Sequence, residues 1–283
     1  MAGDSSTFGS VALGLASAAS WGAGDFSGGL ASRRGSATGV VVASQGVGIA
    51  LLVALATVTG EAAPTARPLA WAALAGANGA FGLLALYSAL ASGRMGIAAP
   101  VSGVVGAVVP VLVGAGVQGW PGALRLAGFA LALVGVWLLT AAGDGADQVG
   151  PRELTLPVLA GVSFGLFLVF IHRAGGSGIL WPLTAARATS MGTLIAVGGV
   201  MRTLRVPRSA LGLTCLAGIL DTGGNAFFVL AAQAGRLDVA GVLSSLYPAS
   251  TVLLACLTLG ERLTRRQTAG AVATLVAIAC VSW

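Results

Sequence analysis

The chain has 283 residues, of which 56% are hydrophobic and 8% are charged, and its formal net charge is +6. Because a soluble domain carries about a quarter of charged residues, this composition excludes an ordinary soluble protein and indicates an integral membrane protein. All basic residues other than one histidine are arginines that lie mostly in short connections, and this pattern does not favour a nucleic-acid partner.

Ten apolar segments follow one another along the chain. Each is long enough to cross a hydrocarbon core of about 30 Å as a helix that rises about 1.5 Å per residue. We predict membrane helices at 8–30, 37–59, 69–92, 96–117, 123–142, 154–173, 179–201, 209–233, 237–258 and 266–283. The first segment lacks a basic flank and exceeds the length of a signal-peptide core, so we expect it to remain in the protein. The predicted fold class is an all-α membrane protein.

The second half of the chain repeats the first at an offset of 142 residues. The offset aligns Gly93-Arg94 with Gly235-Arg236, Ser102 with Ser244, Leu112 with Leu254, and Ala127-Gly128 with Ala269-Gly270. The two halves are predicted at 8–142 and 154–283, joined by the polar sequence DGADQVGPRE. Five helices per half is an odd number, so the second half must enter the membrane from the opposite side. Such inverted repeats are typical of secondary transporters, whose substrate site lies near the midplane between the halves.

Arginine is distributed unequally between the two sides of the predicted membrane. The connections that follow odd-numbered helices hold Arg33, Arg34, Arg94, Arg152, Arg202, Arg205, Arg208, Arg262, Arg265 and Arg266. The other side holds Arg67, Arg125, Arg173 and Arg236. The positive-inside rule places the first group in the cytoplasm and both termini outside.

Few polar side chains lie within the predicted spans, and each costs free energy in hydrocarbon unless it faces a partner or a water-filled cavity. The candidate substrate-binding residues are Trp21, Asp25, Gln45, Asn78, Tyr87, Ser102, Ser163, Arg187, Asp221, Asn225, Ser244 and Tyr247. For each hydroxyl or amide, a hydrogen bond between helices explains the residue equally well. Arg187 and Asp221 lie on neighbouring predicted helices, so an ion pair between them is the alternative to a role in binding.

Prolines occur in two segments that correspond in the two halves. Pro100 and Pro110 lie in the fourth predicted helix, and Pro248 lies in the ninth. A proline removes a backbone donor and clashes with the preceding turn, so we expect both helices to be interrupted. Matched breaks in inverted halves indicate a transport site, and the alternative is a kink that improves packing.

Two short motifs raise the possibility of an aspartyl protease. GAGD at 22–25 matches the GxGD pattern of intramembrane proteases, and DTGG at 221–224 contains the DTG of soluble ones. Two carboxylates that share a proton could activate water. However, the GxGD motif comes first along the chain, no Tyr-Asp precedes it, and the proline-alanine-leucine element of that class is absent. We therefore expect no catalytic residue, and the three scattered cysteines predict no metal or other cofactor.

Three stretches resemble a known family. They are SWGAGDF, ASGRMGIAAPVSGVVGAVVPVLV and AGRLDVAGVLSSLYPASTVLLACLTLGERLTRRQTAG, together with Gly128 and Gly270. The chain resembles the drug/metabolite transporter superfamily over nearly its whole length, specifically the ten-helix members built from two EamA repeats. The resemblance implies export or exchange of small polar metabolites across a bacterial inner membrane. Amino acid exporters, including the aromatic amino acid type, are prominent in this group, and sugar-phosphate, nucleotide-sugar, purine and drug transporters share its fold.

We therefore expect an inner-membrane secondary transporter that exports amino acids or related small metabolites by alternating access. The cavity would lie between helices 1–4 and 6–9. The aromatic faces of Trp21 and Tyr247 would contact the substrate, and Asp25, Arg187 or Asp221 would meet the charged groups of a zwitterion. The alternatives are a multidrug or nucleobase exporter and, less favoured, a lipid scramblase or the protease.

The expected partners are a small-molecule substrate and membrane lipid. The predicted helices 123–142 and 266–283 contain almost no polar residue in mid-span. They would therefore pack at the periphery of the bundle or in the seam of a homodimer.

Overall fold

A computed structural model describes residues 2–32, 34–91, 95–140, 151–175, 178–200, 204–259 and 264–282. Within these ranges the chain forms α-helices and one short 3-10 turn, and no strand. The helices are α1 Ala2–Ser32, α2 Ala37–Thr59, α3 Ala66–Ala91, α4 Met95–Gln118, α5 Ala123–Thr140, α6 Pro151–Ala174, α7 Leu180–Val200, α8 Leu211–Ala234, α9 Leu237–Ser244, α10 Tyr247–Leu259 and α11 Arg265–Ser282. The turn η1 is Arg208–Ala210. Helices α9 and α10 together form the ninth of ten spans.

The helices follow the predicted segments closely. α2 has the predicted bounds, and most other ends differ by one to three residues, whereas α1 begins six residues earlier than expected. Among the described residues, five stretches satisfy a strict length and hydropathy criterion for crossing a membrane: Thr38–Thr59, Ala66–Leu86, Val101–Gln118, Leu154–Ala174 and Arg208–Ala234. The predicted all-α membrane fold is confirmed.

The expectation of a break in the fourth helix is wrong. α4 runs without interruption through Pro110, and the side chain of Pro100 lies outside the described residues. A proline inside a helix removes one hydrogen bond, and the turns on either side can remain intact. The ring of Pro110 packs where a Cβ of Gly241 would lie, 2.6 Å from its Cγ atom. Pro110 therefore packs α4 closely against α9.

The ninth span is broken as expected, between α9 and α10. Pro248 is the second residue of α10 and has no N–H to donate to the carbonyl oxygen of Ser244. The chain turns at Ser245 and Leu246, where the amide of Ser245 donates to Gly241 and that of Leu246 to Leu243. The two spans that correspond in sequence therefore differ in structure.

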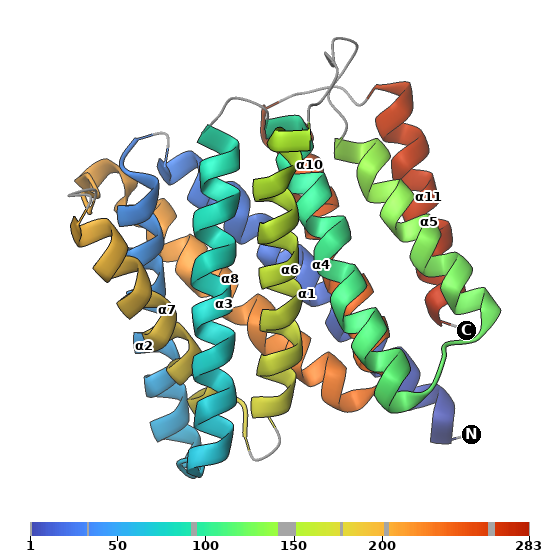
Figure 1. Cartoon of the computed structure of the whole chain (residues 1–283), viewed down its shortest axis with the longest axis horizontal. Coiled ribbons are helices and arrows are strands. Elements are labelled where there is room, and N and C mark those ends of the chain that lie inside the picture. Colours follow the sequence, from blue (N-terminus) through green and yellow to red (C-terminus); the bar gives the residue numbers. More distant parts are fainter. Residues whose placement is uncertain are drawn as a thin grey trace.

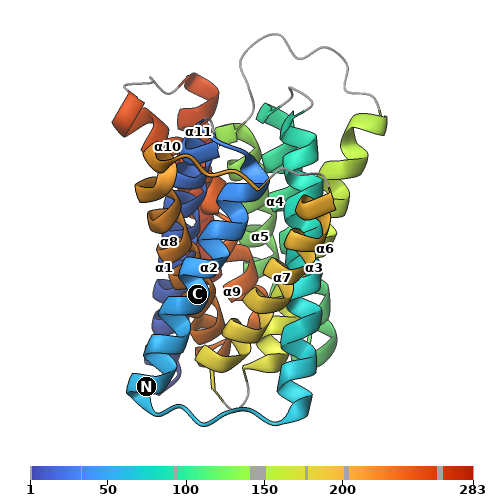
Figure 2. The same cartoon turned by 90° about the vertical axis from the view of Figure 1, so that its left-hand side faces the viewer.

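The two halves interlock instead of lying side by side. α1 packs against α8 as α6 packs against α3, and α1 contacts α9 and α10 as α6 contacts α4. α2 and α7 contact each other, as do α5 and α11, which stand together at one edge (Figure 1). α6 descends in the view in which α1 rises, so the corresponding helices run in opposite directions (Figures 1 and 2). Each contact made by a helix of one half is thus matched by a contact of the corresponding helix of the other half. The boundaries of the two halves, 8–142 and 154–283, stay a prediction.

Glycines at corresponding positions allow the closest helix contacts. A Cβ at Gly76 would overlap the carbonyl oxygen of Ala186, and one at Gly218 would lie 2.5 Å from that of Ser44. At the offset of 142, Gly218 corresponds to Gly76 and Ala186 corresponds to Ser44, so the two contacts are equivalent. Small residues allow helix backbones to approach closely in a membrane, where lipid provides no hydrophobic drive for association. These contacts fix the rotation of α2, α3, α7 and α8.

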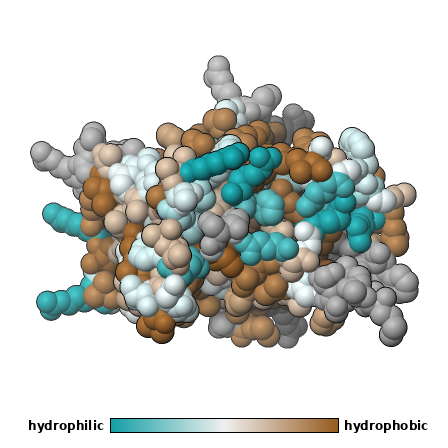
Figure 3. Space-filling model, turned by 90° about the horizontal axis from the view of Figure 1, so that it is seen from below, coloured by the Kyte–Doolittle hydropathy of each residue, from teal (hydrophilic) through white to brown (hydrophobic). Residues whose placement is uncertain are grey.

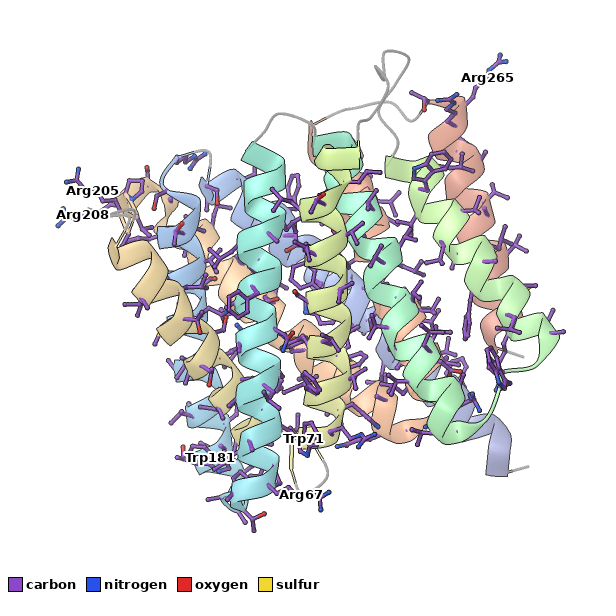
Figure 4. The ribbon with its side chains drawn as sticks, viewed as in Figure 1. Arg67, Trp71, Trp181, Arg205, Arg208 and Arg265 are labelled. Atoms are coloured by element: carbon purple, nitrogen blue, oxygen red, sulfur yellow. The ribbon has the colours of Figure 1, made fainter. Side chains whose placement is uncertain are left out.

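Charged residues lie at both ends of the bundle. Arg205, Arg208 and Arg265 are at the upper end of the view and Arg67 is at the lower end (Figure 4). Seen from below, hydrophilic residues gather over the middle of the lower face and hydrophobic residues adjoin them (Figure 3). The side with more arginine in the sequence is therefore the upper end.

Glu61, in the connection between α2 and α3, caps the start of α7. Its carboxylate accepts hydrogen bonds from the backbone N–H groups of Ile179 at 3.0 Å, Leu180 at 2.9 Å and Trp181 at 3.0 Å. The indole N–H of Trp181 donates to the carbonyl oxygen of Glu61 at 2.8 Å. N–H groups at a helix start have no partner within the helix, so a carboxylate here satisfies them and complements the helix dipole.

Replacing Glu61 by glutamine is expected to lower the free energy of unfolding by about 0.5 to 2 kcal/mol, the range for loss of a helix cap. Titration with SDS in mixed micelles, followed by circular dichroism, measures the change. Arg67→Gln alters one exposed charge near the same connection without touching the cap, and it serves as the control. Equal stability of the two variants would contradict a capping role for Glu61.

Candidate substrate-binding site

Arg187 links three helices in the middle of the bundle. Its side chain is 5% exposed, and Nη2 donates to Oδ2 of Asp221 on α8 at 2.5 Å. Nη1 donates to Oε1 of Gln45 on α2 at 2.5 Å, and Nε2 of Gln45 donates to Oγ of Ser190 at 3.2 Å. The ion pair that the sequence offered as an alternative to substrate binding is therefore present.

Gly48 on α2 makes room for the guanidinium group of Arg187. A Cβ at Gly48 on α2 would lie 3.0 Å from Nη1 of Arg187 and 3.1 Å from its Cδ atom. The same Cβ would lie 2.5 Å from the hydroxyl oxygen of Thr222 on α8. A buried cation is costly unless it is paired and hydrogen-bonded. Gly48 therefore allows α2, α7 and α8 to enclose the charge and its partners.

An aromatic cluster adjoins this network. Trp21 on α1 stacks on Phe228 of α8 with ring centroids 6.2 Å apart, and it meets Tyr247 of α10 edge-on at 6.4 Å. Tyr247 is hydrogen-bonded to Ser102 of α4 and lies within electrostatic reach of Asp25. Asp25 stands one helical turn after Trp21 on α1. Both halves of the chain therefore contribute to the cluster.

Asp25 and Asp221 lie near each other and are accessible to solvent. Asp25 is exposed, the side chain of Asp221 is 44% exposed, and the two carboxylates interact electrostatically. Asp25 stands seven residues before the end of α1 at Ser32, and Asp221 stands ten residues after the start of α8 at Leu211. At about 1.5 Å per residue both lie roughly 10 to 15 Å below the upper helix ends. Both carboxylates are therefore exposed at a depth along the helices, well below their upper ends.

The remaining candidates differ in their surroundings. Asn225 is buried one turn from Asp221, and its amide donates to the carbonyl oxygen of Asp221 at 2.8 Å. Ser244 is fully buried on α9, and its hydroxyl has no hydrogen-bond partner among the described residues. The side chain of Tyr87 lies outside the described residues.

Asn78 and Ser163 are not joined to the cluster by any hydrogen bond within the described ranges. The amide of Asn78 donates to the carbonyl oxygen of Leu74 in its own helix at 2.8 Å. Leu74 and Phe81, on the same face of α3, are exposed, so this face points away from the centre. Ser163 is half-buried on α6. Asn78 thus points away from the other polar candidates.

The site is asymmetric although the halves correspond. Gln45 and Arg187 are 142 residues apart, so they occupy equivalent positions and contact each other. In contrast, Asp221 corresponds at this offset to Gly79. Near the start of the halves the offset is 143, and Asp25 then corresponds to Leu168. Both carboxylates therefore lie on one side of the contact between α2 and α7, and their counterparts carry no charge.

A second polar cluster, which we name the lower clasp, ties the end of α4 to the start of α9. It consists of Arg236, Asp238, Gln118 and Gly119. Arg236 donates to the carbonyl oxygens of Gln118 at 3.2 Å and Gly119 at 2.8 Å. It also binds the carboxylate of Asp238, which is 0% exposed, at 2.8 Å. Hydrogen bonding to Asp238 raises the pKa of the Arg236 guanidinium above its ordinary value, so the group stays charged.

The sequence did not indicate the lower clasp or Ser190 as parts of a polar network. The sequence places Arg236 only in a connection and in the repeated Gly-Arg pair. Ser190 stands three residues after Arg187, so a search for polar residues on the same helical face would have found it. Asp238 stands two residues after Arg236 at the start of α9, and this acid near a helix start was the available signal.

Comparison with known proteins supports the family that the sequence suggested. Residues 152–283 match the model of the EamA-like transporter family. A solved structure described as a crystal structure of a protein superposes with a TM-score of 0.79 and 16% sequence identity, covering 96% of this chain and 94% of that chain. At this identity the similarity shows the fold alone. No curated protein matches the chain significantly. The chain is therefore a multi-pass membrane protein, and its residues 152–283 match the EamA-like transporter family that the resemblance implied.

Proposed function

We propose that the protein is a secondary transporter of a bacterial inner membrane that exports amino acids or related small metabolites by alternating access. One observation carries the proposal. Two solvent-accessible carboxylates, Asp25 and Asp221, lie beside the aromatic rings of Trp21 and Tyr247 where helices of both halves meet. Charged residues inside a membrane protein are rare and mark substrate or ion pathways.

The positions of the charges support export as the direction of transport. The arginine-rich upper end is the cytoplasmic side under the positive-inside rule. Asp25 and Asp221 lie on helix segments that end or begin at this end. A substrate that arrives from the cytoplasm would reach both carboxylates from the upper end, as export requires.

The lower clasp supports an alternating-access mechanism. It holds α4 and α9 together at the lower end, where Gly114 also packs against Asp238, so that a Cβ at Gly114 would lie 3.1 Å from that of Asp238. The break between α9 and α10 lies in the same span and offers a place where the span could bend. Export would then require the clasp to open while contacts at the upper end form.

The arrangement does not favour the protease alternative. An aspartyl dyad works by sharing one proton between two carboxylates. Here Asp221 forms an ion pair with Arg187 at 2.5 Å, so its carboxylate is already engaged by a cation. A proton shared with Asp25 would compete with this ion pair.

Counterflow in proteoliposomes tests the proposed function. Vesicles preloaded with mixed amino acids are expected to exchange one or more of them with labelled external amino acid. Asp25→Asn and Asp221→Asn are each expected to reduce the exchange rate at least tenfold, because both remove a charged group from the site. Glu61→Gln removes a carboxylate at the lower end and should leave exchange near the wild-type rate. Absence of exchange for every amino acid would reject this substrate class.

A further inference from the structure

We infer that the site recognises its substrate by an ammonium group held at Asp25 and Asp221, and that no cationic side chain of the site binds a substrate carboxylate. The recognised class is then a primary amine on an apolar or aromatic body, of which amino acids are one member. This inference rests on the proposed function and goes beyond it, because it separates the amine end of the substrate from the acid end.

The charge of the site is the first argument. Arg187 is the one basic residue in α1, α2, α4, α7, α8 and α10 as their bounds are given above. Its Nη atoms are directed to Gln45 and Asp221, and its side chain is 5% exposed. Its Nε atom has no hydrogen-bond partner among the described residues, but because the side chain is buried, the guanidinium offers little surface to a substrate carboxylate. With Arg187 paired to Asp221, Asp25 is left without a basic partner among the described residues.

The availability of acceptor atoms is the second argument. Asp25 is exposed, and within the described part of the chain its carboxylate has neither a hydrogen-bond nor an ion-pair partner. Arg187 engages Oδ2 of Asp221, and that side chain is 44% exposed. Two like charges near each other repel, and a cation between them removes the repulsion. An ammonium group offers three N–H donors and could bind both carboxylates at once.

The aromatic side chains form the third argument. Trp21 and Tyr247 adjoin Asp25 from α1 and α10, and both are half-buried. An aromatic face attracts a cation that lies within about 6 Å of the ring centroid. The same rings offer apolar surface to the rest of the molecule. The site thus combines a place for a positive charge with a place for an apolar or aromatic group.

A set of three related probes tests the inference on the purified wild-type protein. L-phenylalaninamide keeps the ammonium group and lacks the carboxylate. N-acetyl-L-phenylalanine keeps the carboxylate and lacks the ammonium group, and L-phenylalanine has both groups. In isothermal titration, the amide is expected to bind at least as tightly as phenylalanine, and the N-acetyl compound at least tenfold more weakly. The corresponding leucine compounds repeat the test with a smaller, aliphatic side chain. Preference for the N-acetyl compounds, or no binding of either amide, would overturn the inference.

Asp25 variants locate the ammonium group. Asp25→Asn is expected to weaken binding of the amide about 10- to 100-fold, the range for loss of a charge-assisted hydrogen bond. Asp25→Glu restores the charge and should recover most of the affinity. Glu61→Gln removes the same charge far from the site and should leave the affinity unchanged. Unchanged binding by Asp25→Asn would show that the amine lies elsewhere. The wild-type series still decides the question where the variant does not fold.

Binding and transport give separate results. If the amides bind in the expected order but no compound is exchanged in counterflow, the proposed transport function fails and the inference about recognition stands. If amino acids are exchanged and the N-acetyl compounds compete best, the function stands and the inference fails. The two hypotheses can therefore be rejected independently.

Discussion

Replacing Arg187 by methionine is expected to lower the free energy of unfolding by about 3 to 5 kcal/mol, the cost of removing one partner of a buried ion pair. Methionine keeps much of the side-chain volume, so the main loss is electrostatic. Gln45 loses the donor to its Oε1 atom at 2.5 Å, and Asp221 loses the guanidinium that balances its charge. SDS titration in mixed micelles, followed by circular dichroism, measures the change.

The double variant Arg187→Met with Asp221→Asn provides the control. It removes both charges, so the penalty for an unpaired carboxylate disappears, and stability should recover by more than half of the loss. Asp221→Asn alone leaves Arg187 buried without its counter-ion, and it should be less stable than the double variant. A double variant whose loss equals the sum of the two single losses would contradict the coupling seen in the structure.

Replacing Arg236 by methionine is the second change with a large expected effect. Asp238 is 0% exposed and would remain without its cationic partner, while two carbonyl oxygens at the end of α4 would lose their donors. We expect a loss of about 3 to 5 kcal/mol in the free energy of unfolding. The same SDS titration measures it, and counterflow shows whether weakening of the lower clasp also changes the transport rate.

Two further variants show whether the shape of the guanidinium group matters as well as its charge at position 236. Arg236→Lys keeps the charge but not the planar fork that reaches Asp238 and both carbonyl oxygens, so it should be intermediate in stability. Arg173→Gln removes an exposed arginine from the same face and should change stability by less than about 0.5 kcal/mol. If Arg236→Met were as stable as Arg173→Gln, the lower clasp would have no structural role.

The helices could be predicted from the sequence because the membrane imposes a length on each apolar segment. α2 has the predicted bounds, and the proline in the ninth span predicted the break before α10. The proline in the fourth span predicted a break that is absent. Whether a proline ends a helix depends on what packs around it, and Pro110 packs on Gly241 of α9, a contact between the two halves.

The candidate site could be predicted in part, because ionisable residues are rare in a membrane and attract attention wherever they occur. Asp25, Arg187 and Asp221 were identified in this way, and the structure brings them together. Asn78 shows the limit of the approach, since its polarity gave no information about which way α3 faces. The rotation of each helix is set by contacts such as Gly76 on Ala186, which join residues distant in the sequence.

The contact between Gln45 and Arg187 bears on the evolutionary origin of the chain. In an assembly of two identical halves, a residue at this position would meet its own copy, as at any two-fold axis. Two arginines would repel each other there, and two glutamines could not balance the charge of Asp221. A glutamine facing an arginine requires halves that differ, so this pair could arise only after the two copies had become separate sequences that mutated independently.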